Sequence, residues 1–268
     1  MSFAVHGGAG RRSEPDERAM SVLRKASEIG FEYTAKGDPL NAVVEALYFI
    51  EESGLFNAGK GSVKNEKGFV EMDAGIMRGS DRAAGAVANL REGSAIREAL
   101  RVLKEGRHVL ISYWSIPSDK VGSIREGSLE TIGAVSVADD GEAVAASSTG
   151  GISGKAVGRI GDAAVPGAGF YAVRGIGGTA LTGIGEQNMR CLTAYRIVEK
   201  MKVVDPLEAI SSSFEEVKRE IGALNQGAIA INSSLKMAAL TTELFMPVCF
   251  RRKDVDRCVT SPREGILI

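Results

Sequence analysis

The feature that most constrains the fold is a set of strand-like runs built almost entirely of small residues. TIGAVSVA covers residues 131–138, EAVAASST covers 142–149, and RAAGAVANL covers 82–90. Side chains of such small volume let one sheet approach another closely, so these runs favour sheets packed face to face. Two clusters of strands are each accompanied by helices without strict strand–helix alternation. We therefore predict an α+β chain of packed sheets covered by helices, rather than a doubly wound parallel sheet.

Hydrophobic periodicity and capping residues place the remaining elements. Asp205 is a candidate N-cap, and Pro206 would occupy the first position of the helix that follows. Residues 113–130 are polar and aperiodic, which predicts an irregular linker. The predicted helices cover 14–36, 39–52, 94–106, 186–201 and 205–221. The further predicted strands lie near 2–6, on either side of a turn at 65–68, at 179–183, and in a hairpin over 227–243.

Composition limits the partners and the compartment. The 33 Lys and Arg residues against 34 Asp and Glu residues give a net charge of -1, so no nucleic-acid or anionic-membrane partner is expected. Cys191, Cys249 and Cys258 are odd in number and not closely spaced, which favours a reducing cytoplasm over a disulfide framework. No charged and apolar leader or membrane-length apolar run occurs, so a soluble cytoplasmic protein is expected.

The scarcity of histidine limits the chemistry. His6 and His108 are the two histidines of the chain, and they lie about 100 residues apart. A Ser-His-Asp triad needs a histidine base, and a catalytic zinc site usually needs two or three histidines. The G-x-S-x-G nucleophile elbow is also absent. If the chain is a hydrolase, its base must be another group.

Two glycine-rich motifs each allow a structural interpretation. HGGAG at 6–10 offers backbone amides to a ligand or a reacting carbonyl, but it is equally typical of a strand-to-helix turn. GIGGTA at 175–180 matches a loose dinucleotide pattern. A strand-like segment follows it directly where that pattern requires a helix, so a glycine-rich turn is favoured.

Three polar motifs are candidates for a binding site. In GRIGD at 158–162, Arg159 and Asp162 have the right charges to hold an α-carboxylate and an α-ammonium, or they form a salt bridge with each other. SSTGG at 147–151 and LTGIGE at 181–186 end strands with a hydroxyl and a backbone N–H that could face an oxyanion. Thr131, at the start of its strand, is by itself an ordinary strand-edge residue.

Taken together, the motifs resemble those of one family. From Thr131 onward the chain carries TIGAVSV, SSTGG, GRIGD, PGAGFYA and TGIGE, after HGGAG, FNAGKGSV, EMDAGIM and AGAVA in the first half. This order resembles the plant-type asparaginase and isoaspartyl peptidase family of N-terminal nucleophile hydrolases. The resemblance covers most of the chain and fades after about residue 190. It implies a four-layer αββα sandwich of that type, made as a single-domain precursor over 1–268.

The chemistry that the resemblance implies needs no histidine and no cofactor. The precursor cleaves its own Glu130–Thr131 bond, giving an α subunit, 1–130, and a β subunit, 131–268. The freed α-amine has an ordinary pKa of about 7.7–8.0 and serves as the base for the hydroxyl of the same threonine. The substrate would be the side-chain amide of asparagine or of a β-aspartyl dipeptide, both small molecules. A homodimer of processed units is the assembly that the resemblance implies.

The resemblance also implies a role for individual residues. Thr131 would be the nucleophile and Thr149 would orient it, while Thr182 and Gly183 would stabilise the oxyanion. Arg159 and Asp162 would bind the two charged groups of the substrate. Further positions and their implied roles are Gly183, Gly185 and Asn57 around the substrate, Gly7 and Gly8 in the loop that adjusts on self-cleavage with Glu130, and Ile50, Glu51, Ser53, Phe56, Ala58 and Lys60 as backbone ligands of a structural sodium ion.

The chain departs from the family pattern at named positions, and other functions stay open. Glu130 stands where Gly or Asp is usual, Ser147 replaces a Thr, Ile184 replaces a His, and the linker before Thr131 is short. One alternative is the same fold acting on another amide, as in a glycosylasparaginase-like enzyme or an Asp-specific protease. Another is an uncleaved, non-catalytic relative that binds aspartate or asparagine.

Overall fold

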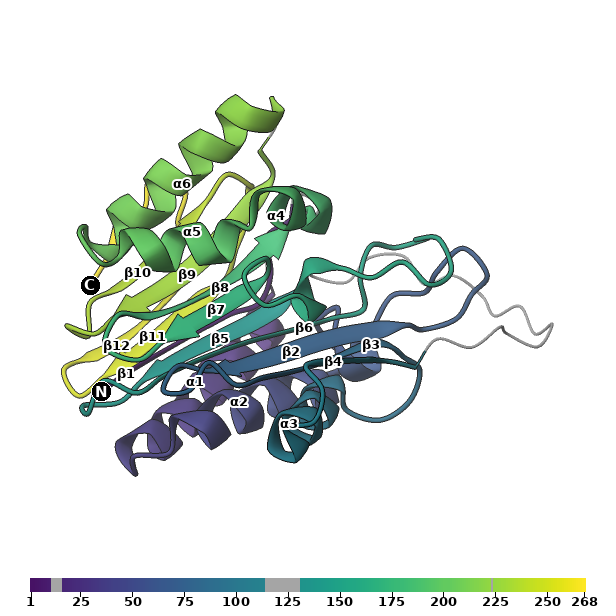
Figure 1. Ribbon diagram of the computed structural model, residues 1–268, viewed down its shortest axis with the longest axis horizontal. Coiled ribbons are helices and arrows are strands. Elements are labelled where there is room, and N and C mark those ends of the chain that lie inside the picture. The colour runs from purple at the N-terminus through teal and green to yellow at the C-terminus, as the bar shows by residue number, and fades with distance from the viewer. Residues whose placement is uncertain (11–15, 114–130, 223) are drawn as a thin grey trace.

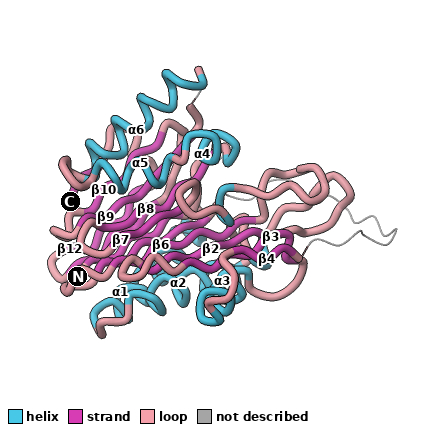
Figure 2. The backbone as a smooth tube through the Cα atoms, in the orientation of Figure 1, coloured by secondary structure: helices cyan, strands magenta, loops and turns pink. Residues whose placement is uncertain are grey.

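The chain forms two mainly antiparallel sheets that lie between two groups of helices (Figures 1 and 2). The structure is a computed structural model, and it describes residues 1–10, 16–113, 131–222 and 224–268. The larger sheet has the strand order β12-β11-β1-β5-β6-β2-β3-β4, and the smaller has the order β13-β10-β9-β8-β7. The α-helices are α1 (Glu17–Ala35), α2 (Pro39–Ser53), α3 (Ala95–Glu105), α4 (Gly185–Cys191), α5 (Thr193–Lys200) and α6 (Pro206–Ile221).

The strands of the larger sheet are β1 (Ser2–His6), β2 (Met72–Arg78), β3 (Ala84–Leu90), β4 (Leu110–Ser112), β5 (Ile132–Val137), β6 (Ala143–Thr149), β11 (Val248–Arg252) and β12 (Val255–Val259). Those of the smaller sheet are β7 (Phe170–Val173), β8 (Gly177–Gly183), β9 (Gln226–Asn232), β10 (Met237–Thr241) and β13 (Ile266–Leu267). Two short 3-10 turns, η1 (Gly59–Gly61) and η2 (Asp162–Ala164), lie in the connections.

Small residues allow the two sheets to meet closely. Val135 of β5, Ala180 of β8 and Ile229 of β9 belong to one buried cluster between the sheets. A Cβ placed on Gly133 would lie 2.9 Å from the Cβ of Ala180, so a larger residue at 133 would push β5 and β8 apart. The chain thus combines six helices with two sheets in its described part, which is compatible with the predicted α+β class.

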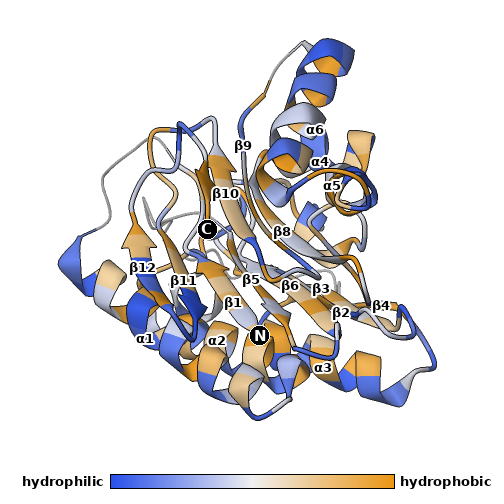
Figure 3. Cartoon of the chain, turned by 90° about the vertical axis from the view of Figure 1, so that its left-hand side faces the viewer, coloured by the Kyte–Doolittle hydropathy of each residue, from blue (hydrophilic) through white to orange (hydrophobic). Residues whose placement is uncertain are grey.

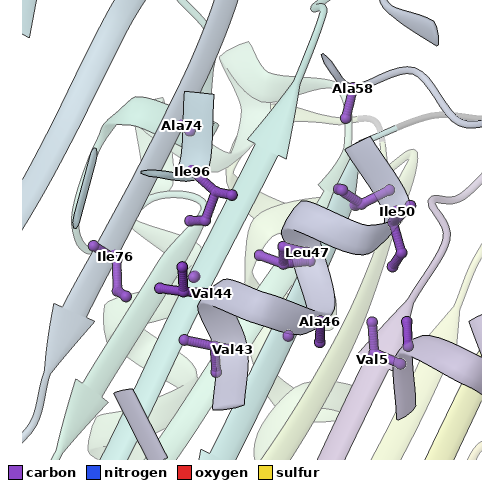
Figure 4. Packing of buried hydrophobic residues seen from close by; sticks show 14 of the residues in the cluster. Val5, Val43, Val44, Ala46, Leu47, Ile50, Ala58, Ala74, Ile76 and Ile96 are labelled. Carbon is purple, nitrogen blue, oxygen red and sulfur yellow. The ribbon is translucent and has the colours of Figure 1, made fainter. Parts of the chain in front are cut away.

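Helices α1–α3 cover the outer face of the larger sheet. Val44 and Leu47 of α2 pack in one cluster with Ile76 of β2 and Ile96 of α3 (Figure 4). On the other side of the molecule, α5 and α6 cover the smaller sheet through a separate cluster that includes Leu181 of β8. Figure 3 shows hydrophilic and hydrophobic stretches along both α1 and α6, as expected for helices with one face against a sheet.

Capping side chains explain where several helices begin. Asp16, Asp38, Ser94 and Asp205 each accept a backbone N–H from the first turn of the helix that follows. An N-cap of this kind contributes about 1 kcal/mol. Pro206 stands at the first position of α6, so the predicted start of that helix is confirmed.

Several predicted elements differ from the observed ones. The single helix predicted over 186–201 is two helices, α4 and α5, because Leu192 adopts a left-handed conformation with φ 49°. The strand pair around 65–68 is reduced to one bridge between Lys64 and Val70 before β2. Strands β4, β7, β11, β12 and β13 were not predicted. Most of the predicted linker falls at 114–130, outside the described residues.

The prediction that the cysteines form no disulfide was wrong. Cys249 of β11 and Cys258 of β12 are paired across the hairpin and form a disulfide, while Cys191 is free and buried. Directly opposed residues of antiparallel strands are close enough for this bond even when they lie nine positions apart in sequence. Within the described ranges no helix combines the length and the apolar character needed to cross a membrane.

Candidate active site

Two threonine hydroxyls meet where β5 begins and β6 ends. Ile132 of β5 pairs with Ser148 of β6, and this antiparallel register places Thr131 across from Thr149. Thr131 Oγ1 donates a hydrogen bond to Thr149 Oγ1 at 3.0 Å, and the two residues are 7% and 2% exposed. The hydroxyl of Thr131 therefore has a fixed partner in a nearly water-free setting.

The turn after Thr149 is held by Asn57. The Gly151 N–H donates to Thr149 Oγ1 at 3.0 Å, so this oxygen accepts from two donors. Asn57 Nδ2 donates to the Gly151 carbonyl at 2.6 Å, and its Oδ1 accepts the Val63 N–H at 3.0 Å. Because both ends of its amide are engaged, Asn57 positions this turn, and its predicted place near the substrate stays a prediction.

The loop after β1 contacts the end of β8. The Ala9 N–H donates to Thr182 Oγ1 at 3.1 Å, which leaves the hydroxyl hydrogen of Thr182 available for another acceptor. Gly183 has φ 119°, a backbone conformation that favours glycine. Gly7 packs against the ring of Phe56, where a Cβ would lie 2.5 Å from Cε1, and Gly8 has φ 95°. HGGAG is therefore a closely packed loop beside Thr182.

His6 lies beside the threonine pair but has no cationic role. Burial lowers the pKa of His6 to about 3, against a smaller upward effect of the Thr131 backbone. His6 Nδ1 accepts the Gly8 N–H at 3.2 Å, so the neutral ring carries its proton on Nε2, which faces Gly133. The ring orders the loop and cannot serve as a charged catalyst at neutral pH.

Arg159 and Asp162 converge on Gly185. A Cβ at Gly185 would lie 2.7 Å from Asp162 Oδ1 and 3.0 Å from Arg159 Nη2. The expected alternative of a direct salt bridge between Arg159 and Asp162 is replaced by other contacts. Arg159 Nε and Nη2 donate to Glu186 at 2.9 Å each, and Asp162 Oδ2 accepts from Asn188 Nδ2 at 2.7 Å. One cation and one carboxyl thus border the same small space.

A buried pair, Asp73 and Lys155, lies between the threonines and the segment that carries Arg159 and Asp162. Asp73 of β2 lies opposite Thr149 in the sheet and accepts the Gly161 N–H at 2.8 Å. Lys155 Nζ lies 3.9 Å from Asp73 Oδ2 and beside Gly151. Burial raises the pKa of Asp73 and lowers that of Lys155, with the opposite charge acting against each shift. Sequence reasoning missed this role, although a charged residue inside the strand-like EMDAGIM was a signal for it.

The residues expected to hold sodium lie at the end of α2 and in the loop after it. Three of these carbonyls already accept a hydrogen bond. The Ile50 carbonyl accepts from the Ser53 hydroxyl, the Phe56 carbonyl from the Ala58 N–H, and the Ala58 carbonyl from the Gly61 N–H. A second lone pair remains on each, and the Phe56 and Gly54 carbonyls converge on Gly61. These oxygens suit a hard cation, but nothing in their contacts requires one. Elsewhere in the described part of the chain, no group of three or more His, Cys, Asp and Glu residues could hold a metal.

The side chain of Glu51 has a separate structural role. Its carboxylate accepts the hydroxyls of Ser148 and Ser94 at 2.5 Å and the Ile96 N–H at 3.1 Å. Burial raises the pKa of Glu51, while these three donors act in the opposite direction. Glu51 therefore ties α2 and the start of α3 to the strand residue next to Thr149.

Comparison with known proteins identifies the family of this chain. A family model described as asparaginase matches residues 1–116 and 114–259. An isoaspartyl peptidase/L-asparaginase of Xenopus laevis is 33% identical over 266 residues, which cover 87% of this chain and 86% of that protein. A plant-type L-asparaginase of Pyrobaculum calidifontis is 34% identical over 56% of this chain and 63% of its own length.

A shorter match is closer in sequence. A plant-type L-asparaginase of Pyrococcus furiosus is 42% identical over 114 residues, which are 41% of this chain and 37% of that protein. The family matched by the model has the fold of the N-terminal nucleophile hydrolases, and the mixed helices and sheets of this chain are compatible with that fold. The chain belongs to the asparaginase family, which confirms the resemblance found in the sequence.

Proposed function

We propose that this chain is the precursor of an amidohydrolase that cleaves the side-chain amide of L-asparagine and of β-aspartyl dipeptides. The observation that carries the proposal is the buried hydrogen bond between Thr131 Oγ1 and Thr149 Oγ1. The relatives named isoaspartyl peptidase/L-asparaginase and plant-type L-asparaginase support this substrate class. Hydrolysis of the peptide bond between residues 130 and 131 turns the Thr131 nitrogen from an amide into an amine, and only the amine is a base.

The reaction then runs in two steps. The α-amine takes the proton of Thr131 Oγ1, and the oxygen attacks the side-chain carbonyl of the substrate. The Thr182 hydroxyl and the Gly183 N–H are the donors for the resulting oxyanion. The amine returns the proton to the leaving nitrogen, so ammonia or a peptide amine departs and a β-aspartyl ester of Thr131 remains. Water, deprotonated by the same amine, hydrolyses the ester and releases aspartate.

Substrate selection follows from the charges around Gly185. Arg159 binds the α-carboxylate and Asp162 binds the α-ammonium, so a free amino acid end is required. This requirement disfavours a protease that acts inside protein chains. The leaving group lies outside this contact, so a glycosylasparaginase-like activity is the remaining enzymatic alternative. Ile184, which is 38% exposed, adjoins this side of the site.

The proposal extends to the fold, the processing and the assembly of the chain. The two sheets and their covering helices correspond to the four-layer αββα sandwich of the N-terminal nucleophile hydrolases. The precursor over 1–268 is one domain, which becomes subunits 1–130 and 131–268 and assembles as a dimer of processed units. The backbone carbonyls of Phe56 and Ala58, on either side of Asn57, would hold a structural sodium ion. Glu130 and the peptide bond before Thr131 lie outside the described residues.

The test is intact mass after incubation at neutral pH, together with ammonia release from asparagine. We expect two chains split between residues 130 and 131, and turnover that appears as the split proceeds. Thr131→Ala should stay whole and inactive because it lacks the hydroxyl, whereas Thr131→Ser should still split. Cleavage of Thr131→Ala at this bond, or asparagine hydrolysis by that variant, would refute the proposal. Aspartate binding without turnover would favour the non-catalytic alternative.

A further inference from the structure

A chain of side-chain amides lies behind Asp162. Asn188 of α4 donates from Nδ2 to Asp162 Oδ2 at 2.7 Å, and its Oδ1 accepts from Gln226 Nε2 at 2.6 Å. Asn188 and Gln226 have no exposed surface, and Asp162 is 4% exposed. The first residue of β9 is thereby connected, through one helix residue, to a carboxyl that borders the candidate substrate space.

The direction of these hydrogen bonds is set by the carboxylate. An ionised Asp162 only accepts, so Asn188 must turn its NH₂ toward it and its oxygen toward Gln226. Gln226 must then donate, and its own Oε1 is left buried without a hydrogen-bond partner among the described residues. Leaving a buried acceptor unpaired costs about 1–3 kcal/mol. The hydrogen bonds thus satisfy the Asp162 carboxylate and leave Gln226 Oε1 without a partner among the described residues.

The charged groups around Asp162 come from several elements. Arg159 precedes it in the same loop, and Glu186 faces it from α4. Asp73 of β2 binds the neighbouring Gly161 N–H, and Lys155 lies beside Asp73, while β3 and β6 contain no charged residue. Burial raises the pKa of Asp162 to about 6, and Asn188 and Arg159 act in the opposite direction. Removing Asn188 would therefore favour the protonated carboxyl.

We propose that Asn188, held by Gln226, is a positioning residue that keeps Asp162 ionised and aimed at the α-ammonium group of the substrate. The inference rests on the proposed function, in which Asp162 binds that group. Asn188 does not touch substrate itself. Its effect should therefore be confined to ligands that carry an α-ammonium.

The test compares two substrates that differ in this group alone. Succinamate is asparagine without its α-amino group, so it makes no demand on Asp162. In Asn188→Leu, KM for asparagine at pH 7 should rise about tenfold, the value expected for one lost hydrogen bond to a charged group. We expect kcat to change less than threefold and succinamate kinetics less than twofold. The asparagine defect should shrink as the pH rises above 7, within the range where the substrate still carries its ammonium, because Asp162 then ionises without help.

Two further variants separate this role from a structural one. Gln187→Leu is the matched control, because Gln187 Oε1 accepts the Asn225 N–H at 3.0 Å and so joins the same two segments without contacting Asp162. It should leave both substrates unchanged. Gln226→Leu frees the Asn188 amide to rotate and should raise the asparagine KM in the same direction, but less. Equal losses for both substrates in Asn188→Leu, or a defect that does not vary with pH, would overturn the inference.

A binding measurement keeps this test independent of turnover. Wild-type protein that hydrolyses neither amide would refute the proposed function, and the affinities for aspartate and succinate can still be compared by calorimetry. The preference for aspartate should fall about tenfold in Asn188→Leu and persist in Gln187→Leu. An unchanged preference, or a wild-type protein that binds succinate as well as aspartate, would refute the role of Asn188.

Discussion

The replacement Thr149→Val tests the central contact of the site. Valine has nearly the shape of threonine, so no cavity forms and the change is the loss of one hydroxyl. Thr149 Oγ1 accepts from Thr131 Oγ1 and from the Gly151 N–H, both at 3.0 Å, and both partners are buried. An unpaired Gly151 N–H should lower the free energy of unfolding by about 1–3 kcal/mol.

The catalytic effect has the same origin. Without its acceptor, the Thr131 hydroxyl rotates freely. The hydrogen bond that orients it, which contributes about 1–3 kcal/mol, is lost. This corresponds to a fall in kcat of roughly 5- to 150-fold for the cleaved enzyme. Intact mass measured over time should show slower self-cleavage of the precursor by a comparable factor. Ammonia release from asparagine then gives kcat and KM for the cleaved fraction.

Thr149→Ser is the matched control because it keeps the hydroxyl and removes a methyl group. It should retain kcat within about threefold and lose under 1.5 kcal/mol of stability. Self-cleavage and kcat of Thr149→Val within threefold of wild type would show that the hydrogen bond does not orient the nucleophile. A large loss in Thr149→Ser as well would show that packing, rather than the hydroxyl, is the critical property.

Two other predictions concern the charged side of the site. Gly185→Ala would place a methyl group 2.7 Å from Asp162 Oδ1 and 3.0 Å from Arg159 Nη2, so both side chains must shift and KM for asparagine should rise at least tenfold. An unchanged KM would refute the location of the substrate. In wild type, asparagine KM should rise below the Asp162 pKa of about 6, approaching tenfold per pH unit, because the protonated carboxyl no longer pairs with an ammonium. Succinamate KM should stay flat over the same range, and parallel curves for the two substrates would contradict this assignment.

The secondary structure was predictable where a local signal exists. Asp205 and Pro206 mark the start of α6 with a side-chain acceptor and a fixed φ angle, and both act through the helix itself. The break at Leu192 has no such marker, since leucine rarely adopts φ 49°. Strands β11 and β12 were missed because they lie at one edge of the larger sheet, where charged residues such as Arg251 and Asp256 are tolerated.

The hydroxyl pair was predictable because two facts coincide. The motifs around Thr131 and Thr149 match a family pattern, and the two residues stand at the ends of the strand-like runs 131–138 and 142–149. The roles of Asn188 and Gln226 had no such signal. An amide in a helix or at the start of a strand is common, and its meaning depends on a partner 38 positions away in the sequence. These contacts arise only where α4 packs against η2, which contains Asp162, and against the start of β9, which contains Gln226.

The pairing of Arg159 with Glu186 also has a consequence for substrate binding. Glu186 holds Nε and Nη2 of the guanidinium, so an incoming α-carboxylate competes for at least one of the groups that face Gly185. Glu186 is 49% exposed, and exposed ion pairs contribute about 0–1 kcal/mol. Even with its two-pronged geometry, the pair should weaken substrate binding by no more than about fivefold. Arg159 is therefore held in one orientation at small cost, so under the proposed function an α-carboxylate would meet a guanidinium that is already in place.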